Sequence, residues 1–400
     1  MKRYAIPLTG LLCLALSACP QPAPSPTVAP APPVVTSVTC PDGSDLLTHV
    51  QYVQLSVLPQ SDSVQPNSVH PNMDFTVAAD LTPIDPAIQH DLAAAFAANP
   101  AFAKNALCPS STTPGGVTNP GLDGIFINRA QCVNPINPSD YDPSNCSSMS
   151  DTDIAANSWG LRTPLPTSKT YIAISLGLWR CPSGRGYCAP PFAQFYQRLV
   201  KALFDKTACG SQKPPCNAAD INRPVFQSST DTSGLSVLAT LAHERGHIWW
   251  WEQFVQPPGS TPYTPTLISK AAAFCRGVIY PGGNWQGVPV RLPEYRYVEF
   301  GQLSQNSPVR DLPALLNSNP AGAAALVDGI YSRGQYPSVL AAYSLDEEFV
   351  EAFQWSVLRN AGLAEFTANI TGTSRPILHL GHASDGGAEA KLRCFDDLSR

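Results

Sequence analysis

The chain has 400 residues, of which 44% are hydrophobic and only 14% are charged, and its formal net charge is −5. This apolar content with so little charge excludes a chain that is disordered throughout, and the lack of any Lys/Arg cluster excludes a nucleic-acid partner. The 41 prolines and 12 cysteines, together with the scarce charge, indicate a protein that resides outside the cytoplasm.

The N-terminus has the pattern of an export signal. Lys2 and Arg3 precede an apolar run over residues 5–16, which is too short to span a bilayer. The run ends in Leu-Ser-Ala-Cys at positions 16–19, which resembles a bacterial lipobox. This resemblance implies that residues 1–18 are a lipoprotein signal peptide and that Cys19 carries a lipid that anchors the mature chain to the membrane. Ordinary secretory cleavage, with Cys19 incidental, is the alternative.

A proline-rich segment follows the anchor. Seven prolines lie between residues 20 and 33, where they alternate mainly with Ala, Ser, Thr and Val. Such a composition favours extended backbone and cannot pack a core. We therefore expect residues 19–40 to be the lipid anchor and its tether. No second linker of this kind follows, so we interpret residues 41–400 as a single domain.

Ten cysteines remain when Cys13 and Cys19 are set aside, an even number for an oxidising compartment. Close spacing favours three short loops, namely Cys132 with Cys146, Cys181 with Cys188 and Cys209 with Cys216. Longer links are left for Cys40, Cys108, Cys275 and Cys394. No C-x-x-C pair is present, so a zinc ribbon is disfavoured and disulfides are expected.

Helical and strand patterns alternate along this domain. Asp85 has the character of a helix N-cap followed by proline, and the apolar four-residue spacing after it predicts a helix that ends at Asn99. Residues 124–128 form a short apolar strand, and residues 171–176 alternate as a strand does. A further helix presents one apolar face made of Phe192, Phe195, Tyr196, Leu199 and Leu203. These elements predict an α+β fold with long disulfide-tied loops.

The most informative segment reads His-Glu-Arg-Gly-His at 243–247, inside an apolar helix that begins near Ser233. Four-residue spacing places His243 and His247 on one face, a turn apart, where both imidazoles can bind one metal ion. Glu244 lies beside them, in position to take a proton from a water activated by that metal. The alternative is a solvated helix end that has this spelling by chance.

These residues resemble the active-site helix of the zincin metallopeptidases. Two positions that hold glycine and histidine in the metzincin branch are Trp250 and Gln253 here, which excludes that branch. The gluzincin branch instead takes its third zinc ligand, a glutamate, from a later helix. The resemblance therefore implies a zincin-like α+β domain with a small mixed sheet and a bound Zn²⁺.

A helix suited to that glutamate is expected over residues 344–353. Among its acids only Glu347 has another acid four residues later, Glu351. The stretch is similar to the E-x-F-x-E-A-F segment of lethal-factor-like gluzincin toxins, which implies that Glu347 is the third ligand with His243 and His247, and that Glu351 orients a histidine. The alternative is that Glu347 only completes a capping box with Ser344, while Asp346 or Glu348 faces solvent.

The resemblance implies a zinc-dependent peptidase that uses Glu244 as its base to hydrolyse extracytoplasmic protein or peptide substrates in the cell envelope. A catalytically silent zincin-fold lipoprotein that acts by binding and a zinc hydrolase of a non-peptide substrate are the alternatives. In zincins an edge strand pairs with extended substrate, and residues 171–176 are either that strand or an ordinary core strand. An oxyanion-stabilising tyrosine, for which Tyr331, Tyr336 and Tyr343 are available, stays unassigned.

Overall fold

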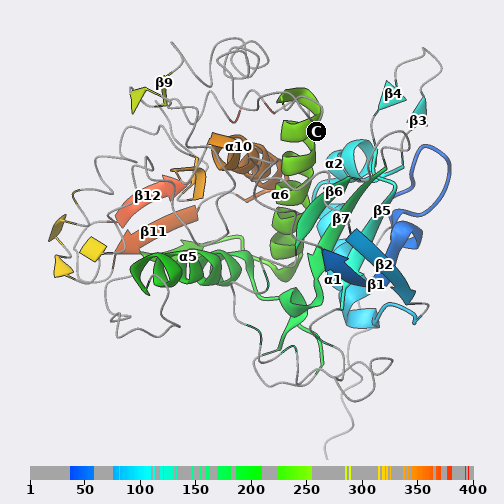
Figure 1. The fold of residues 1–400 in the computed structure, drawn as a ribbon, viewed down its shortest axis with the longest axis horizontal. Helices are drawn as coiled ribbons and strands as arrows, with labels where there is room; N and C mark the ends of the chain where they lie inside the picture. The colour runs from blue at the N-terminus through cyan, green and yellow to red at the C-terminus, as the bar shows by residue number, and fades with distance from the viewer. Residues whose placement is uncertain are drawn as a thin grey trace, which may run out of the picture. The chain divides into compact units, whose positions relative to one another are not determined.

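The structure is a computed structural model (Figure 1). It describes residues 37–57, 75–80, 82–109, 111–112, 118–119, 121–129, 132, 146, 149, 154, 158–162, 169–181, 186–209, 224–254, 284–285, 288–289, 314–315, 318–319, 321–322, 325, 337–338, 340–342, 345–363, 366–370, 376–380, 392 and 395. All of these belong to the unit Val35–Arg400. The predicted signal peptide and almost all of the predicted anchor and tether lie outside the described residues, so the domain boundaries stay predictions.

A five-stranded mixed sheet forms one half of the described fold. Its strands are β1 (Val50–Val57), β2 (Phe75–Asp80), β5 (Gly124–Asn128), β6 (Trp159–Arg162) and β7 (Thr170–Ser175). They lie in the order β2-β1-β5-β7-β6, with β1, β5 and β7 parallel. The outer strands β2 and β6 run antiparallel to their neighbours. The predicted strand over 124–128 is confirmed as β5.

The two faces of this sheet pack into different apolar clusters. Ile125 and Ile172 belong to the large core on the helical side, whereas Phe126 belongs to a second cluster on the other face. The Phe126 ring also stacks on Tyr171 with the ring centroids 4.7 Å apart. Because β7 is covered on both faces and lies between β5 and β6, the expectation of a substrate-facing edge strand at 171–176 is wrong. The core-strand alternative is correct, and the edge strand at this end is β6.

The remaining described elements are further strands, the α-helices and several shorter helical turns. The strands are β3 (Ser111–Thr112), β4 (Thr118–Asn119), β8 (Pro224–Ser228), β9 (Asn284–Trp285), β10 (Val288–Pro289), β11 (Phe366–Ile370) and β12 (Pro376–Leu380). The α-helices are α1 (Pro86–Ala98), α2 (Pro100–Phe102), α5 (Phe192–Cys209), α6 (Ser233–Phe254) and α10 (Leu345–Asn360). Shorter turns are η1 (Leu46–His49), η2 (Ala103–Leu107), η3 (Leu176–Trp179) and η7 (Leu340–Ala342). The structure thus confirms a mixed α+β fold.

Helix boundaries follow the capping residues that the sequence contains. The Asp85 carboxylate accepts a hydrogen bond from the Ala87 N–H at 2.9 Å, and Pro86 occupies the first turn. The α1 helix ends before Asn99, whose side chain caps the next turn by accepting from the Phe102 N–H at 3.0 Å. The helix predicted between Asp85 and Asn99 is therefore confirmed.

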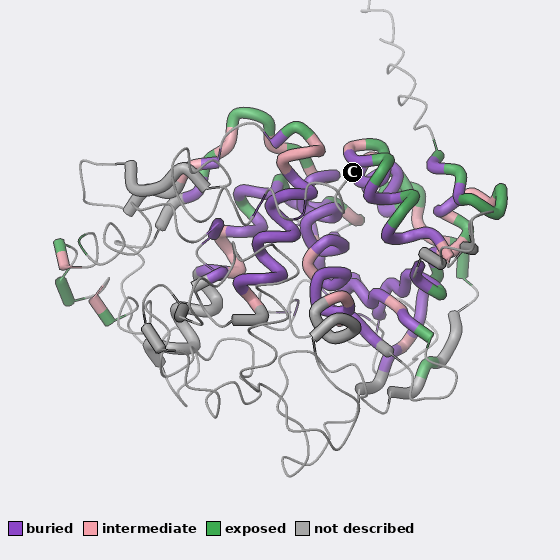
Figure 2. Tube along the Cα trace, turned by 90° about the horizontal axis from the view of Figure 1, so that it is seen from above, coloured by how far each residue is buried: buried purple, intermediate pink, exposed green. Residues whose placement is uncertain are grey.

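Helix α6 lies at the centre of the described fold. It contacts α1, α5, α10, β6 and β7, and Figure 1 shows it between the five-stranded sheet and α10. Nearly every residue from Leu235 to Ile248 is buried. In Figure 2 the buried residues form a continuous central region, with exposed residues at its margin. An apolar sequence on all sides of a helix is what such a central position requires.

The described part of the chain contains three disulfides, and two of them are pairs expected from close spacing. These two are Cys132–Cys146 and Cys181–Cys188. The third, Cys40–Cys108, joins two of the cysteines that were left for longer links. The Cys209 side chain and residues 216, 275 and 394 lie outside what the structure describes. Disulfides of this kind indicate an extracytoplasmic protein. Within the described part of the chain, no helix combines the length and apolarity needed to cross a bilayer.

Removing the Cys40–Cys108 disulfide should cost more stability than removing Cys181–Cys188. The two pairs close loops of sequence separation 68 and 7. Loop-closure entropy then predicts losses of about 4 kcal/mol for the first pair and about 2.5 kcal/mol for the second. Unfolding of the two double Cys→Ser variants in guanidinium chloride, without reductant, measures both free energies. An equal or larger loss for the short loop would contradict the expectation.

Candidate metal centre

Two histidines of α6 point their imidazoles to the same place. His243 and His247 are one turn apart, and their Nε2 atoms are 3.1 Å from each other. The His247 side chain is 9% exposed and the His243 side chain 21%, so the pair lies at the border between core and solvent. The four-residue spacing thus places both imidazoles on one face of α6, as predicted.

Glu347 reaches this pair from α10. One of its carboxylate oxygens lies 3.6 Å from the His243 Nε2 atom and the other lies 3.6 Å from the His247 Nε2 atom. Its neighbour Glu348 is buried, with 1% exposure, and so does not face solvent as the alternative interpretation required. The side chains of Ser344 and Asp346 are outside the described residues. Of the acids considered for this role, Glu347 is the one that the described structure places with both histidines.

The spacing of these three side chains fits one metal ion. Ligand atoms at about 2.1 Å from a tetrahedral zinc ion are about 3.4 Å from one another. The two histidine Nε2 atoms are 3.1 Å apart, and each of them lies 3.6 Å from a different oxygen of the Glu347 carboxylate, so all three contacts are close to that value. Two imidazole nitrogens and a carboxylate oxygen are also donors that zinc accepts. The group can therefore hold a metal ion, and the donor types fit zinc.

A second layer of polar groups surrounds His243. Its Nδ1–H faces the Glu351 Oε1 atom and the Gln354 Oε1 atom, each at 3.1 Å. The other Glu351 oxygen accepts hydrogen bonds from the Ser338 hydroxyl at 2.6 Å and from the Trp355 indole N–H at 3.2 Å. Glu351 is fully buried, and these three donors compensate the loss of its hydration. The geometry agrees with the expected role of Glu351 as the carboxylate that orients a histidine.

Close contact between α6 and α10 brings the ligands of the two helices together. Gly246, between the two histidines, faces α10, and a Cβ atom at this position would lie 3.2 Å from side-chain atoms of Val350 and Phe353. Val350 and Phe353 are themselves fully buried. A glycine on α6 thus allows the backbones to approach. The apolar contact between these helices sets how far Glu347 stands from the histidines.

The carboxylates around His243 create a strongly negative site. Burial by itself would lower the pKa of His243, but Glu347, Glu351 and Glu244 together raise that pKa to about 10. Such a field attracts positive charge, whether a proton or a metal ion. Burial raises the pKa of Glu244 to about 7, although His243 and a hydrogen bond from the Gly160 N–H act in the opposite direction. A pKa in this range suits a group that exchanges protons near neutral pH.

The edge strand β6 lies against α6 near Glu244. The backbone N–H of Gly160 in β6 donates a hydrogen bond to the Glu244 carboxylate. A Cβ atom at Gly160 would stand 2.6 Å from the Glu244 carbonyl oxygen and 2.9 Å from the Ile248 side chain. Only a glycine lets the strand come this near the helix backbone.

Substitution of Gly160 by alanine should therefore destabilise the protein by about 1–3 kcal/mol, the usual cost of overpacking a core. The obstacle is a helix carbonyl, which cannot turn aside as a flexible side chain can. Gly124→Ala on β5 is a matched control, because its Cβ would meet no atom nearer than 3.5 Å. Urea unfolding of both variants measures the difference. Equal midpoints for Gly160→Ala and Gly124→Ala would refute this close contact.

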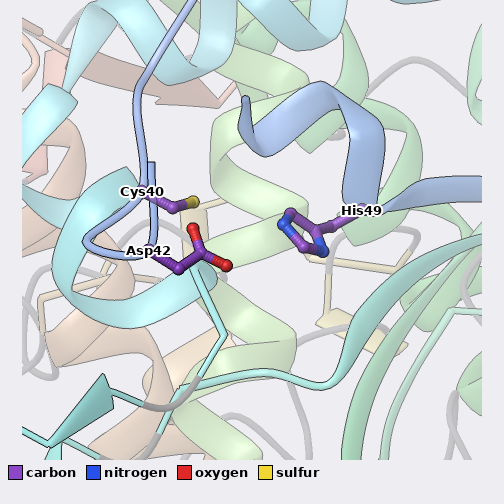
Figure 3. A group of neighbouring side chains, drawn as sticks. All are labelled: Cys40, Asp42 and His49. Atoms are coloured by element: carbon purple, nitrogen blue, oxygen red, sulfur yellow. The ribbon is translucent and has the colours of Figure 1, made fainter. Parts of the chain in front are cut away.

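A second group of possible metal ligands lies far from the motif in sequence. Figure 3 shows Cys40, Asp42 and His49 facing one another near η1. The Cys40 sulfur is bonded to Cys108, and the His49 Nε2 atom is 2.7 Å from the Ser44 hydroxyl oxygen. A disulfide sulfur is not a thiolate, so this group lacks the third ligand that a zinc site requires. We do not assign a metal to it.

Sequence reasoning missed three residues of the centre. Gln354 lies seven residues after Glu347, a spacing that returns to the same helix face, so its position could have been recognised. Ser338 and Gly160 reach the site through tertiary folding, and no local pattern signals them. The three tyrosines considered for the oxyanion, Tyr331, Tyr336 and Tyr343, lie outside the described residues.

Comparison of the chain with protein-family models, with curated proteins and with solved structures found no match in any of the three.

Proposed function

We propose that the protein is a zinc-dependent peptidase of the gluzincin type, carried as a lipoprotein and acting on extracytoplasmic protein or peptide substrates. The observation that carries this proposal is the triangle of side chains formed by His243, His247 and Glu347, in which the Nε2 atoms are 3.1 Å apart and each lies 3.6 Å from one Glu347 oxygen. Glu244 stands beside this triangle on the same helix. Two ligand histidines with an adjacent glutamate are the combination that zinc hydrolysis of an amide requires.

In the proposed reaction, zinc would polarise the scissile carbonyl and lower the pKa of a water molecule beside it. Glu244 takes a proton from the water that attacks the carbonyl and transfers it to the departing amine. The Gly160 N–H holds the Glu244 carboxylate in place through its hydrogen bond. Glu351 accepts from the His243 Nδ1–H, which turns the opposite nitrogen toward the ligand triangle.

The position of β6 supports a peptide as the substrate. It is the outer strand of the sheet, antiparallel to β7, and it contacts α6 next to Glu244. An outer strand offers backbone N–H and C=O groups that an extended peptide can pair with. A substrate bound along β6 would place its backbone close to Glu244. This role replaces the one first considered for residues 171–176.

The cellular site follows from the cysteines. The three disulfides indicate an oxidising compartment outside the cytoplasm. With a lipid on Cys19 and a proline-rich tether, the domain would be held at the cell envelope and act on substrates there. Replacement of Cys19 by serine, followed by membrane fractionation, distinguishes lipid anchoring from simple secretion.

The experiment that tests the function combines metal analysis with peptide cleavage. Purified protein should contain one zinc ion per chain and cleave members of a broad peptide library. Cleavage should stop with 1,10-phenanthroline, continue with the non-chelating 1,7-isomer, and return when zinc is added. Protein without stoichiometric zinc would overturn the metal centre. Zinc-loaded protein that cleaves no peptide would overturn the peptidase assignment.

A further inference from the structure

Gln354, the second hydrogen-bond acceptor that faces the His243 Nδ1 atom, is the residue to which a new role can be assigned. Gln354 is buried, with 4% exposure, and its Oε1 atom is 3.1 Å from the His243 Nδ1 atom. Burying an amide is unfavourable unless a hydrogen bond compensates the lost hydration. Its contact with His243 therefore joins a buried polar group directly to a ligand of the candidate metal centre.

The position of Gln354 on α10 brings it to His243 with Glu351. Glu347, Glu351 and Gln354 are separated by four and three residues, so they lie along one face of the helix. All three contact His243: Glu347 at the Nε2 atom, and Glu351 and Gln354 at the Nδ1 atom. One helix face thus surrounds both nitrogens of a single imidazole.

The chemistry of the two acceptors determines the state of that imidazole. Neither a carboxylate oxygen nor an amide carbonyl oxygen carries a hydrogen, so the His243 Nδ1 atom bears the proton and donates it. In the neutral ring the Nε2 lone pair then faces His247 and Glu347. This is the tautomer that a metal ligand needs.

An amide is better suited to this position than a further acid. His243 is already surrounded by the carboxylates of Glu347, Glu351 and Glu244. A fourth buried carboxylate would repel these neighbours, whereas the glutamine oxygen adds an acceptor without adding charge. Glu351 also accepts hydrogen bonds from Ser338 and Trp355, so its carboxylate is not reserved for His243.

We propose that Gln354 is a positioning residue of the metal centre: it shares the His243 Nδ1–H with Glu351 and thereby holds the ring with Nε2 toward His247 and Glu347. This inference rests on the proposed zinc site and goes beyond it, because it assigns a second, uncharged partner to the ligand histidine. Loss of a partner of this kind typically weakens metal binding about 10- to 100-fold.

The test measures zinc affinity by competition with a chelator, and the absorption spectrum of the cobalt-substituted protein. Gln354→Leu should bind zinc at least about tenfold more weakly and shift the cobalt bands, because the ligand ring turns. Gln89→Met is a control, since it replaces an exposed helical glutamine far from α10 in sequence. A role of Gln354 in folding alone would lower the unfolding midpoint and leave the cobalt spectrum of the folded protein unchanged.

A double-mutant cycle with Glu351→Leu sharpens the test. If the two acceptors share one proton, each single variant retains one of them, and the double variant should lose more affinity than the two single losses multiplied. If Gln354→Leu does not fold, the same measurements are made on Gln354→Met, whose side chain is unbranched. If the wild type binds zinc and Gln354→Leu has the same zinc affinity and cobalt spectrum as the wild type, the role of Gln354 is overturned and the proposed function is not. Wild type that binds no zinc would overturn it together with the proposed function.

Discussion

The Glu244→Gln variant will retain one zinc ion per chain and lose peptide hydrolysis by about 10²- to 10⁴-fold in kcat/KM, the usual contribution of a general base. Glutamine has the size of glutamate and can still contact the Gly160 backbone, but its amide cannot take a proton from the attacking water. The proposed metal ligands are His243, His247 and Glu347, so the ion should stay bound. Zinc content and single-turnover cleavage of a fluorogenic peptide measure the two properties separately.

Glu252→Gln provides the control for Glu244→Gln, because Glu252 is the other glutamate of α6 and is not one of the residues proposed to act in the site. It should leave both zinc content and cleavage near wild-type values. Unchanged cleavage in Glu244→Gln would eliminate Glu244 as the base. Loss of zinc in the same variant would instead show that the carboxylate helps to hold the ion.

The second large effect concerns the ligand that α10 contributes. Glu347→Gln should weaken zinc binding by more than about 100-fold, beyond the range seen when only an outer partner of a ligand is lost. The reason is that a neutral amide oxygen replaces one of three donors and removes a negative charge that faces both Nε2 atoms. Competition with a chromogenic chelator measures the zinc dissociation constant.

Asp346→Asn is the matched comparison for Glu347→Gln. It removes an equal charge from the neighbouring position of the same helix, so a general electrostatic effect would weaken zinc binding in both variants. The proposed centre predicts a large loss for Glu347→Gln alone. Tight zinc binding by Glu347→Gln, or a comparable loss in Asp346→Asn, would remove Glu347 from the ligand set.

The two histidines of the candidate centre could be chosen from the sequence because helical geometry is local. His243 and His247 meet through the period of one helix, and Glu347 was selected over Asp346 and Glu348 by the acid at i+4, Glu351. The structure places Glu347 near both histidines and Glu351 beside His243, which is the arrangement that the resemblance to gluzincins implied. What the sequence could not supply was the partners from outside the two helices, because Ser338 and Gly160 approach through long-range packing.

The edge strand shows a different limit of prediction from the sequence. Residues 171–176 alternate in a way that is typical of a strand with one exposed face. In the structure Ile172 faces the helical core, while Tyr171 stacks on Phe126 across the sheet and Ala173 joins the second cluster. Burial of both faces is a property of the neighbouring strands and cannot be seen in one strand alone. The edge position of β6 likewise depends on strand order, which is a long-range property.

The contact through Gly246, Val350 and Phe353 has a consequence for handling the protein. These residues join α6 to α10 by apolar packing and are not among the proposed ligands, so this helix contact does not itself need a bound ion. We expect side chains held by such a contact to lose little conformational entropy when an ion binds. We therefore expect that a bound zinc ion could be exchanged for a spectroscopic substitute such as cobalt in the native state, without a cycle of unfolding and refolding.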